Sequence, residues 1–196
     1  MPDLSIEQLY SGIVAGVDEA GRGPWAGPVV AAAVILNPYH IPEGINDSKK
    51  LSATKREMLF SRIIEMSHVG IGTADVEEID RLNILAATKL AMQRAVMALP
   101  VKPDVALIDG NQPPTLFCKT HPVVKGDSKS LSIAAASIIA KVTRDRTMQE
   151  LAKLFPHFGW QKNAGYGTKE HRDALEAFGV TEYHRKSFAP IRLLLA

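Results

Sequence analysis

Two apolar runs near the N-terminus, at residues 13–17 and 29–36, flank an acidic pair and a glycine-rich turn. Each run is short, is partly β-branched, and is bounded by charge, glycine or proline, which favours a β-strand over a helix. Because a Gly-Pro turn separates them, the two strands are expected to pair as a hairpin. This arrangement places Asp18 and Glu19 at the end of the first strand, directly before Gly21-Arg22-Gly23.

The rest of the chain alternates strand and helix patterns, which predicts an α/β fold. Further strands are expected at 68–73, 103–109 and 123–125, and helices at 52–66, 84–99, 130–147 and 169–178. Asp75 and Glu78 have the spacing of a helix capping box. The segment 103–109 is apolar without alternation, so it should be covered on both faces, and the nearly all-apolar helix 84–99 should be buried. No repeat or linker interrupts the pattern, so we expect a single domain over residues 1–196.

Composition restricts the class of protein. With 46% hydrophobic and 22% charged residues and a net charge of +2, the chain is typical of soluble globular proteins. Its single cysteine, Cys118, allows neither an intrachain disulfide nor a cysteine-based metal site. The N-terminus lacks the features of a secretory signal, and prolines interrupt the longest nearly uncharged run, 23–42. We therefore expect a cytoplasmic protein without a membrane span.

Charge is distributed unevenly along the chain. Residues 141–196 contain ten Lys or Arg and six Asp or Glu, whereas the remainder is slightly acidic. A basic C-terminal quarter is compatible with a phosphate-bearing partner, and equally with a solvated face.

Acidic residues follow three predicted strands or junctions. Asp18 and Glu19 close the first strand, Asp109 ends "ALIDG", and Asp127 stands before a helix in "VVKGDSKS". Ligands in open α/β sheets bind where strand ends meet, and carboxylates gathered there repel one another unless a cation neutralises them. Oxygen ligands of this kind suit Mg²⁺ or Mn²⁺, and two such ions could serve phosphodiester hydrolysis. Any one of these residues alone could instead be a turn former or helix cap.

Asp18 and Glu19 raise a geometric difficulty, because neighbours on a regular strand point to opposite faces. They could share one site if the strand bulges or ends between them, or if a backbone carbonyl replaces one carboxylate. Gly21 and Gly23 would permit such an irregularity and would also let a ligand approach the backbone, with Arg22 meeting a phosphate. A plain tight turn is the alternative.

Several segments together resemble ribonuclease HII, the bacterial type 2 ribonuclease H family. They are "GVDEAGRGPWAGPVVAAAVIL", "INDSKKLSATKRE", "LIDGN", "VKGDSKSLSIAAASIIAKVTRDR", "NAGYGTKEHRDAL" and "HRKSFAP". The resemblance implies a ribonuclease H-like fold, with a central five-stranded mixed sheet flanked by helices and a helical, substrate-binding C-terminal region from about residue 150. The related ribonuclease HIII normally has an additional N-terminal domain, and only about a dozen residues precede the first strand here, which disfavours that family.

The same resemblance implies a function. Such enzymes cleave the RNA strand of RNA–DNA hybrids and incise 5′ to single ribonucleotides in duplex DNA, leaving 3′-hydroxyl and 5′-phosphate ends. It implies that the metal-binding carboxylates are Asp18, Glu19, Asp109 and Asp127. It also implies that Gly21, Arg22, Gly23 and Tyr166 recognise the RNA–DNA junction.

Junction recognition has a physical basis, because the 2′-hydroxyl distinguishes RNA from DNA locally. Backbone groups at the two glycines could bond to it, and the Tyr166 ring could pack on the following deoxyribose. Without the resemblance, Tyr166 could equally be a surface aromatic residue.

Other assignments are looser. Residues suited to phosphate contacts are Lys49, Lys50, Ser128 and Lys129. Residues that could grip the nucleic-acid backbone, or simply be solvated, are Lys169, Arg185 and Lys186. His171 and His184 are expected to be structural and receive no catalytic role.

Two expectations concern charge pairing and the C-terminus. Asp145 should pair with Arg144 or Arg146. The apolar tail "IRLLLA" should pack on the domain, although a sliding clamp is a conceivable partner, and a monomer is expected.

Two other classes of function remain open. A non-catalytic nucleic-acid module would explain the basic quarter and the Gly-Arg-Gly turn, but not the carboxylates, which repel phosphate. A metal-dependent phosphatase for small phosphates would use the carboxylates, but it would not explain Tyr166.

Overall fold

Five strands form one mixed sheet in the order β3-β2-β1-β4-β5, in a computed structural model that describes residues 1–195. The strands are β1 (Val14–Ala20), β2 (Val29–Leu36), β3 (Ser67–Ala74), β4 (Val105–Asp109) and β5 (Lys119–Val123). The β1–β2 and β2–β3 pairs are antiparallel, and the β1–β4 and β4–β5 pairs are parallel. The predicted hairpin and the five-stranded mixed sheet are therefore confirmed.

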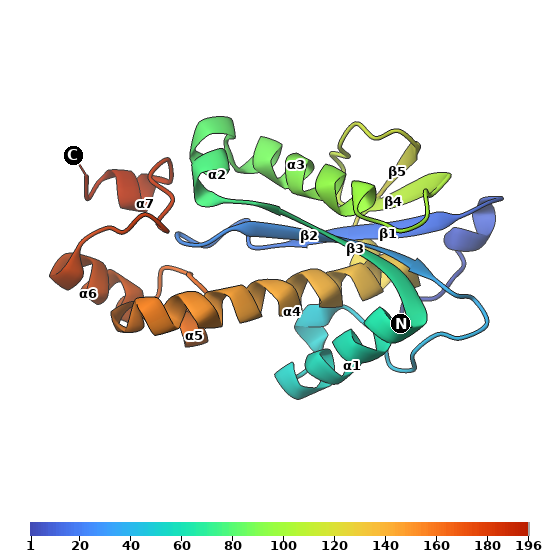
Figure 1. The fold of residues 1–196 in the computed structure, drawn as a ribbon, viewed down its shortest axis with the longest axis horizontal. Coiled ribbons are helices and arrows are strands. Elements are labelled where there is room, and N and C mark those ends of the chain that lie inside the picture. The colour runs from blue at the N-terminus through green and yellow to red at the C-terminus, as the bar shows by residue number, and fades with distance from the viewer. Residues whose placement is uncertain (196) are drawn as a thin grey trace.

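Helices cover both faces of the sheet (Figure 1). They are α1 (Ala53–Met66), α2 (Val76–Leu82), α3 (Ile84–Met97), α4 (Leu131–Leu154), α5 (Trp160–Asn163), α6 (Lys169–Phe178) and α7 (Ala189–Arg192), with 3-10 turns η1 (Glu7–Leu9), η2 (Ser48–Lys50), η3 (Gly126–Ser128) and η4 (Pro156–Phe158). α2 and α3 lie on one face, and α1 and α4 lie on the other. The second half of α4 extends past the sheet, where α5 packs against it and α6 and α7 follow (Figure 1).

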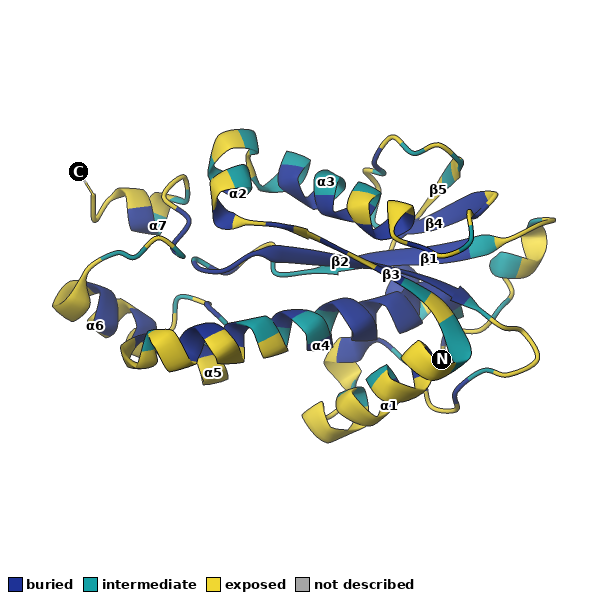
Figure 2. Ribbon diagram, viewed as in Figure 1, coloured by how far each residue is buried: buried dark blue, intermediate teal, exposed yellow. Residues whose placement is uncertain are grey.

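The central strands are buried because both faces are covered (Figure 2). Val105 to Ile108 of β4 are at most 5% exposed, as the unbroken apolar run predicts. α4 approaches β1 closely because its first half is built on small residues and because Gly16 has no side chain. A Cβ atom at Gly16 would lie 2.1 Å from the Ser132 carbonyl carbon in the α4 backbone. This close approach brings the N-terminus of α4, with Asp127 just before it, beside the end of β1.

Three expectations about individual segments were wrong. The strand expected at 123–125 is β5, which ends at Val123, because Lys125 adopts a left-handed conformation (φ 55°) that a strand cannot continue through. The pattern missed β5 because this edge strand is polar and contains Pro122. α4 continues seven residues past the expected end at Thr147. Helices η4 and α5 lie within 156–168, which was expected to be irregular.

The apolar segment after β3 also differs from expectation. Asp75 forms the predicted capping box with Glu78, but it starts the separate helix α2. Asn83, at φ 70°, ends α2, and its side chain caps α3 by accepting hydrogen bonds from Leu85 N and Ala86 N. α3 is buried on one face only, because its other face is open to solvent, where Met97 is 75% exposed.

No helix within residues 1–195 combines the length and apolar character required to cross a membrane.

Candidate active site

The acidic pair lies where β1 extends beyond β4. β1 pairs with β4 only as far as Val17, opposite Ile108, whereas its pairing with β2 continues regularly through Asp18, Glu19 and Ala20. The regular register means that neither a bulge nor a strand end separates Asp18 from Glu19, so two of the three alternatives given above for a shared site were wrong.

The two carboxylates reach the same sheet edge from opposite faces. Strand alternation puts Asp18 on the α4 side with Gly16, and Glu19 on the α3 side with Val17. The Asp18 Oδ1 atom then turns toward the edge that β4 leaves unpaired and accepts a hydrogen bond from the Glu19 backbone N–H at 2.7 Å. Because β1 extends beyond β4, both carboxylates reach one sheet edge without a bulge between them.

Asp109 and Asp127 approach the same edge from two other elements. Asp109 is the last residue of β4, and its Oδ1 accepts a hydrogen bond from Gly126 N at 2.7 Å. This bond ties the end of β4 to η3, which contains Asp127 and leads into α4. A small cleft of about 60 Å³ is lined by Glu19 and Asp109 together with residues of α3.

Negative charge accumulates at this edge without enough compensation. Burial, and then the charges of Glu19, Asp109 and Asp127, raise the pKa of Asp18 well above its ordinary value. Burial also raises the pKa of Glu19 and of Asp109. Two basic side chains offset part of the repulsion, since Arg22 lies 3.3 Å from Glu19 and Lys49 lies 3.4 Å from Asp127.

The donor set fits a hard divalent cation in its chemistry. All four groups are carboxylates, and the raised pKa values of three of them show that added positive charge would be stabilising. Within residues 1–195, no three His, Cys, Asp or Glu side chains are already gathered closely enough to enclose a metal ion. The present side-chain positions instead pair Glu19 with Arg22 and Asp127 with Lys49.

The two glycines of the Gly21-Arg22-Gly23 turn serve different purposes. Gly21 has a φ of +98°, and a Cβ atom there would lie 2.0 Å from Arg144 Nε, so its missing side chain makes room for a buried arginine rather than for a ligand. Gly23 faces Tyr166, because a Cβ atom at this position would lie 3.3 Å from the tyrosine Cε1 atom. The structure thus brings together the turn and the aromatic ring, which is 51% exposed.

Two buried arginines bond to the β1–β2 loop, residues 21–28. The sequence did not predict that both would be buried against this loop. Arg144 of α4 donates to the carbonyls of Pro28, Ala26 and Ala164. Arg185 donates to four carbonyls in the loop, and both side chains are at most 2% exposed. Arg185 was a candidate for a nucleic-acid contact or a solvated position, but its side chain is buried and faces inward. Burial lowers the pKa of Arg144 to about 10 and that of Arg185 to about 9.

His171 and His184 lie side by side in the C-terminal core, both fully buried. Their Nε2 atoms are 3.0 Å apart, and the Trp160 indole N–H also donates to His171 Nε2 at 3.2 Å. Burial lowers the pKa of both rings, and that of His184 falls to about 4, helped by the charge of His171. These contacts support the structural role expected for both residues.

This histidine pair predicts a loss of stability in mild acid. The unfolded chain protonates His184 near its ordinary pKa of about 6.5, whereas the folded chain does so only near pH 4. Below pH 6.5 the unfolded state therefore binds more protons, and stability is lost as the pH falls toward 4. Urea unfolding should show that His184→Gln removes about 2 kcal/mol of the wild-type loss between pH 7 and pH 5. The exposed His157→Gln is the control, and an unchanged pH dependence in His184→Gln would contradict the assignment.

The remaining basic candidates make surface contacts. Lys50 lies 3.9 Å from Asp47, and Lys169 lies 2.6 Å from Asp173. The Ser128 hydroxyl donates to the Lys125 carbonyl, and Lys129 is exposed.

The expected pairing of Asp145 was wrong. It pairs with Lys141, one turn earlier on α4, while Arg146 pairs with Glu57 of α1. The tail also differs from expectation, because Ile191 is buried but Leu193, Leu194 and Leu195 are at least 50% exposed.

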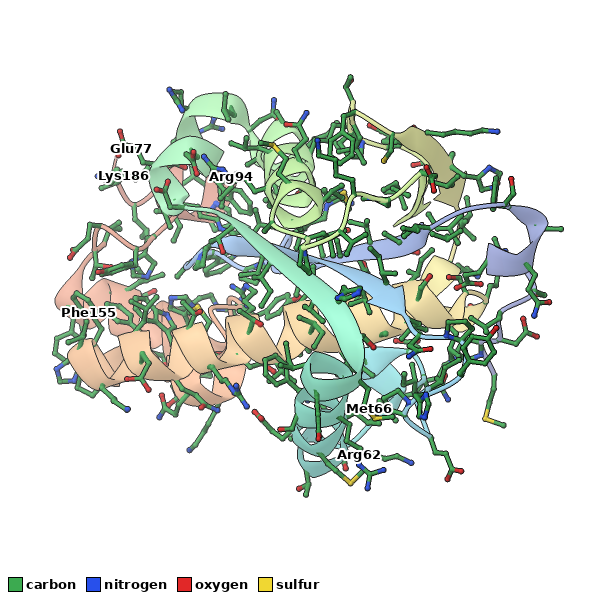
Figure 3. The ribbon with its side chains drawn as sticks, turned by 45° about the vertical axis from the view of Figure 1, so that its right-hand side comes forward. Arg62, Met66, Glu77, Arg94, Phe155 and Lys186 are labelled. Atoms are coloured by element: carbon green, nitrogen blue, oxygen red, sulfur yellow. The ribbon has the colours of Figure 1, made fainter. Side chains whose placement is uncertain are left out.

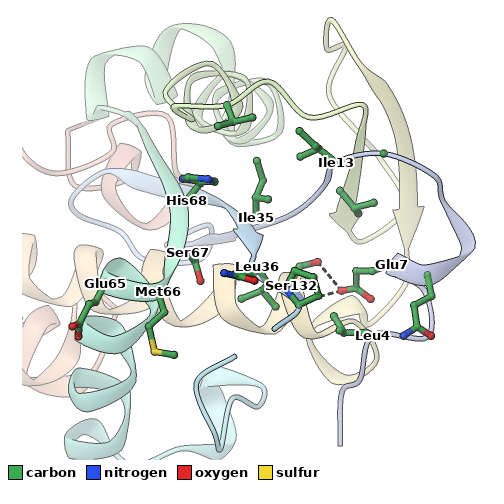
Figure 4. Close-up of a pocket in the computed structure, with 16 residues that line it drawn as sticks. Leu4, Glu7, Ile13, Ile35, Leu36, Glu65, Met66, Ser67, His68 and Ser132 are labelled. Carbon is green, nitrogen blue, oxygen red and sulfur yellow. Dashed lines mark hydrogen bonds between the residues drawn. The ribbon is translucent and has the colours of Figure 1, made fainter. Parts of the chain in front are cut away.

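A cavity of about 650 Å³ lies at the opposite end of the sheet, beside Ile13 and Leu36 (Figure 4). Glu7 reaches into this region to accept hydrogen bonds from Ser130 and Ser132 at the start of α4. None of the acidic sheet-edge residues lines it.

Comparison with solved structures defines the class of protein. The chain is similar to ribonuclease H2 from Pyrococcus horikoshii OT3, with a TM-score of 0.77 and 30% identity over 93% of this chain and 96% of the other. The fold is therefore that of a ribonuclease H enzyme.

Sequence comparison defines the family. The family model described as Ribonuclease HII matches residues 15–191. Ribonuclease HII of Jannaschia sp. (strain CCS1) is 57% identical over 99% of this chain and 98% of its own length. That of Wolbachia sp. subsp. Brugia malayi (strain TRS) is 56% identical over 97% of this chain and 94% of its own length. The chain belongs to the ribonuclease HII family, as the sequence motifs predicted.

Proposed function

We propose that this ribonuclease cleaves the RNA strand of RNA–DNA hybrids and incises duplex DNA 5′ to single ribonucleotides. The observation that supports this most strongly is the adjacency of two features, an acidic edge at Asp18 and Glu19 and a turn at Gly23 that faces Tyr166. Only one residue separates Glu19 from the turn, so a sugar bound at the turn would place its 5′ phosphate near the carboxylates.

The carboxylates that would hold divalent ions are Asp18, Glu19, Asp109 and Asp127. Two ions, Mg²⁺ or Mn²⁺, would supply an activated hydroxide and stabilise the departing oxygen when bound there. Attack on the phosphorus 5′ to the ribonucleotide breaks the bond to the preceding 3′ oxygen, which leaves a 3′-hydroxyl and a 5′-phosphate.

Basic side chains at this edge have a second use in the proposed reaction. Arg22 and Lys49 currently neutralise Glu19 and Asp127, and both side chains are more than half exposed. Since cations at the edge would take over that neutralisation, the two basic groups would become free to contact substrate phosphates. Ser128 and Lys129 follow Asp127 at the turn before α4, on the same side of the site as Lys49. They are proposed as further contacts to the nucleic-acid backbone.

Tyr166 and the turn would select the junction. The exposed Tyr166 ring offers a flat apolar surface for a deoxyribose, and an added 2′-hydroxyl at that sugar would crowd it. Backbone groups of Gly21-Arg22-Gly23 would bond to the 2′-hydroxyl of the preceding ribonucleotide.

The decisive test is incision of a DNA duplex with one embedded ribonucleotide, with Mg²⁺, with Mn²⁺ and with EDTA. We expect one cut, 5′ to the ribonucleotide, with either metal and none with EDTA. The all-DNA duplex is the control and should remain intact. Salt-sensitive binding without any incision in either metal would contradict the proposal and favour a binding module.

A further inference from the structure

His184 and Arg185 are consecutive residues, both fully buried, that lie between the two halves of the proposed junction reader. One half is the β1–β2 loop with Gly21-Arg22-Gly23, and the other is the segment that contains Tyr166. Neither residue is close in sequence to the acidic edge. The Arg185 side chain bonds to the loop, and the His184 side chain reaches the Tyr166 segment through His171.

Arg185 fixes the shape of the β1–β2 loop. Its Nη2 donates to Gly21 O at 2.6 Å and to Pro28 O at 3.1 Å. Its Nη1 donates to Arg22 O at 3.0 Å, and its Nε donates to Gly27 O at 2.9 Å. A single planar guanidinium therefore joins the beginning of the loop to its end. An ammonium group could not span these four acceptors, because its three donors project from one point.

His184 acts on the other half through His171. The His171 Nδ1 atom lies 3.0 Å from the Tyr166 carbonyl, which can only accept, so Nδ1 carries the proton. His171 Nε2 is then an acceptor, for Trp160 and for His184 Nε2–H. His184 Nδ1 in turn accepts from Thr181 N–H at 3.0 Å. Both tautomers are thus determined, and the chain of bonds ends on the backbone of Tyr166.

The two halves are also bonded directly to each other. Trp25 N donates to Gly165 O at 2.8 Å, and Arg185 N donates to Trp25 O at 2.8 Å. Arg144 joins Ala26 O to Ala164 O from the α4 side. The segment around Lys186 is anchored at its outer side, because Lys186 N donates to Asp80 Oδ2 of α2 at 2.9 Å.

Burying a guanidinium whose hydrogen-bond acceptors are all carbonyls has a high desolvation free energy. Within residues 1–195, no carboxylate lies within ion-pairing distance of Arg185. Its charge is stabilised mainly by four backbone carbonyls, with the Phe188 ring 5.1 Å away and the more distant charge of Asp80 contributing. If filling this buried space were the only requirement, a packed apolar side chain would do so without the desolvation penalty of a charge. What the guanidinium adds is directional bonding to the carbonyls of Gly21 and Arg22, the first two residues of the Gly21-Arg22-Gly23 turn.

We propose that His184 and Arg185 are positioning residues, which hold Gly21-Arg22-Gly23 and Tyr166 in the one relative geometry that reads a ribonucleotide–deoxyribonucleotide junction. This inference rests on the function proposed above. Neither residue touches substrate, and each acts through the backbone of a residue that does. Loss of either should therefore reduce discrimination between substrates rather than cleavage in general.

The test compares kcat/KM on two substrates, a duplex with one embedded ribonucleotide and an RNA–DNA hybrid of the same sequence. We expect Arg185→Lys and His184→Gln each to lower the ratio of single-ribonucleotide to hybrid cleavage about tenfold, because small misplacements of positioning groups have effects of this size. Arg62→Lys, on exposed α1 (Figure 3), and His157→Gln are the matched controls and should leave the ratio unchanged.

A double-mutant cycle separates positioning from general destabilisation. Tyr166→Ala should lower the ratio, and adding His184→Gln to it should lower the ratio no further, because His184 acts through Tyr166. Urea unfolding establishes that each variant is folded under assay conditions. Thr181→Val, which removes only the hydroxyl 2.9 Å from His184 Nδ1, gives a milder perturbation that should move the ratio in the same direction.

The outcomes distinguish this inference from the proposed function. If the wild type does not incise at single ribonucleotides, the proposed function fails. If the wild type and Tyr166→Ala behave as expected while Arg185→Lys and His184→Gln lower both activities equally, only the positioning role is overturned. Independent, multiplicative losses in the Tyr166→Ala background would overturn it as well.

Discussion

Replacing Asp18 by asparagine is expected to lower ribonucleotide incision about 10³-fold and, at the same time, to raise the thermal stability of the protein. A metal-binding carboxylate supplies several kcal/mol of transition-state stabilisation, and each 1.4 kcal/mol corresponds to tenfold in rate. Stability should move in the opposite direction because the Asp18 carboxylate is buried among three other acidic groups.

The sign of the stability effect follows from the pKa of Asp18. Burial and like charge raise this pKa above its value in the unfolded chain, so the ionised carboxylate destabilises the fold at neutral pH. Asparagine has the same shape and no charge, and its Oδ1 can still accept the hydrogen bond from Glu19 N. The substitution therefore removes repulsion without removing a contact.

The measurement pairs the incision assay in Mg²⁺ with thermal unfolding in metal-free buffer. Asp173→Asn, which removes an exposed carboxylate that pairs with Lys169 on α6, is the control and should change neither quantity appreciably. Retained turnover in Asp18→Asn would contradict the four-carboxylate mechanism. Loss of stability would contradict the electrostatic account of the acidic edge.

Replacing Gly16 by alanine is expected to destabilise the protein by about 3 kcal/mol, at the upper end of overpacking effects. The added Cβ atom would lie 2.1 Å and 2.2 Å from backbone atoms of Ser132 and Ile133. Because these are backbone atoms at the start of a long helix, no side chain can rotate away to make room. α4 must move off β1, and this movement would also carry Asp127 away from Asp18.

Gly179→Ala provides a control that isolates backbone strain from steric conflict. Gly179 has a φ of 77° and a ψ of −175°, a backbone region that is essentially restricted to glycine, and nothing lies within 4 Å of an added Cβ atom. Alanine there should therefore cost about 1 to 3 kcal/mol through backbone strain alone. Urea unfolding measures both losses, and only Gly16→Ala should also lower incision, because only it displaces Asp127. A loss of less than about 1 kcal/mol in Gly16→Ala would show that α4 tolerates displacement and that the close approach is not required.

Local patterns were sufficient for much of the fold. The hairpin of β1 and β2 follows from two apolar runs around a turn, and the Asp75–Glu78 capping box follows from spacing alone. These features depend on residues that are near one another in sequence. The edge strand β5 was misplaced for the converse reason, since the polar segment Lys119–Val123 becomes a strand only because β4 offers it a partner.

The motifs identified which residues form the acidic edge but not how they meet there. Asp18 and Glu19 reach one edge because β1 extends two or three residues beyond β4, which is a property of strand register between distant segments. No sequence pattern indicates that Arg144 and Arg185 are buried. Their acceptors in the β1–β2 loop lie more than 100 residues away along the chain.

The amino-acid sequence by itself therefore determined the family, and it supplied the four carboxylates proposed to hold metal ions and the turn and tyrosine proposed to read the sugar. Those properties reside in residue type and short spacing. Only the tertiary structure decided why Gly21 is glycine, how two neighbouring carboxylates share an edge, and what holds Gly23 against Tyr166. Each of these depends on contacts between segments far apart in the chain. These contacts are the hydrogen bonds of a buried guanidinium, the extension of β1 beyond β4, and the packing of α4 on a glycine of β1.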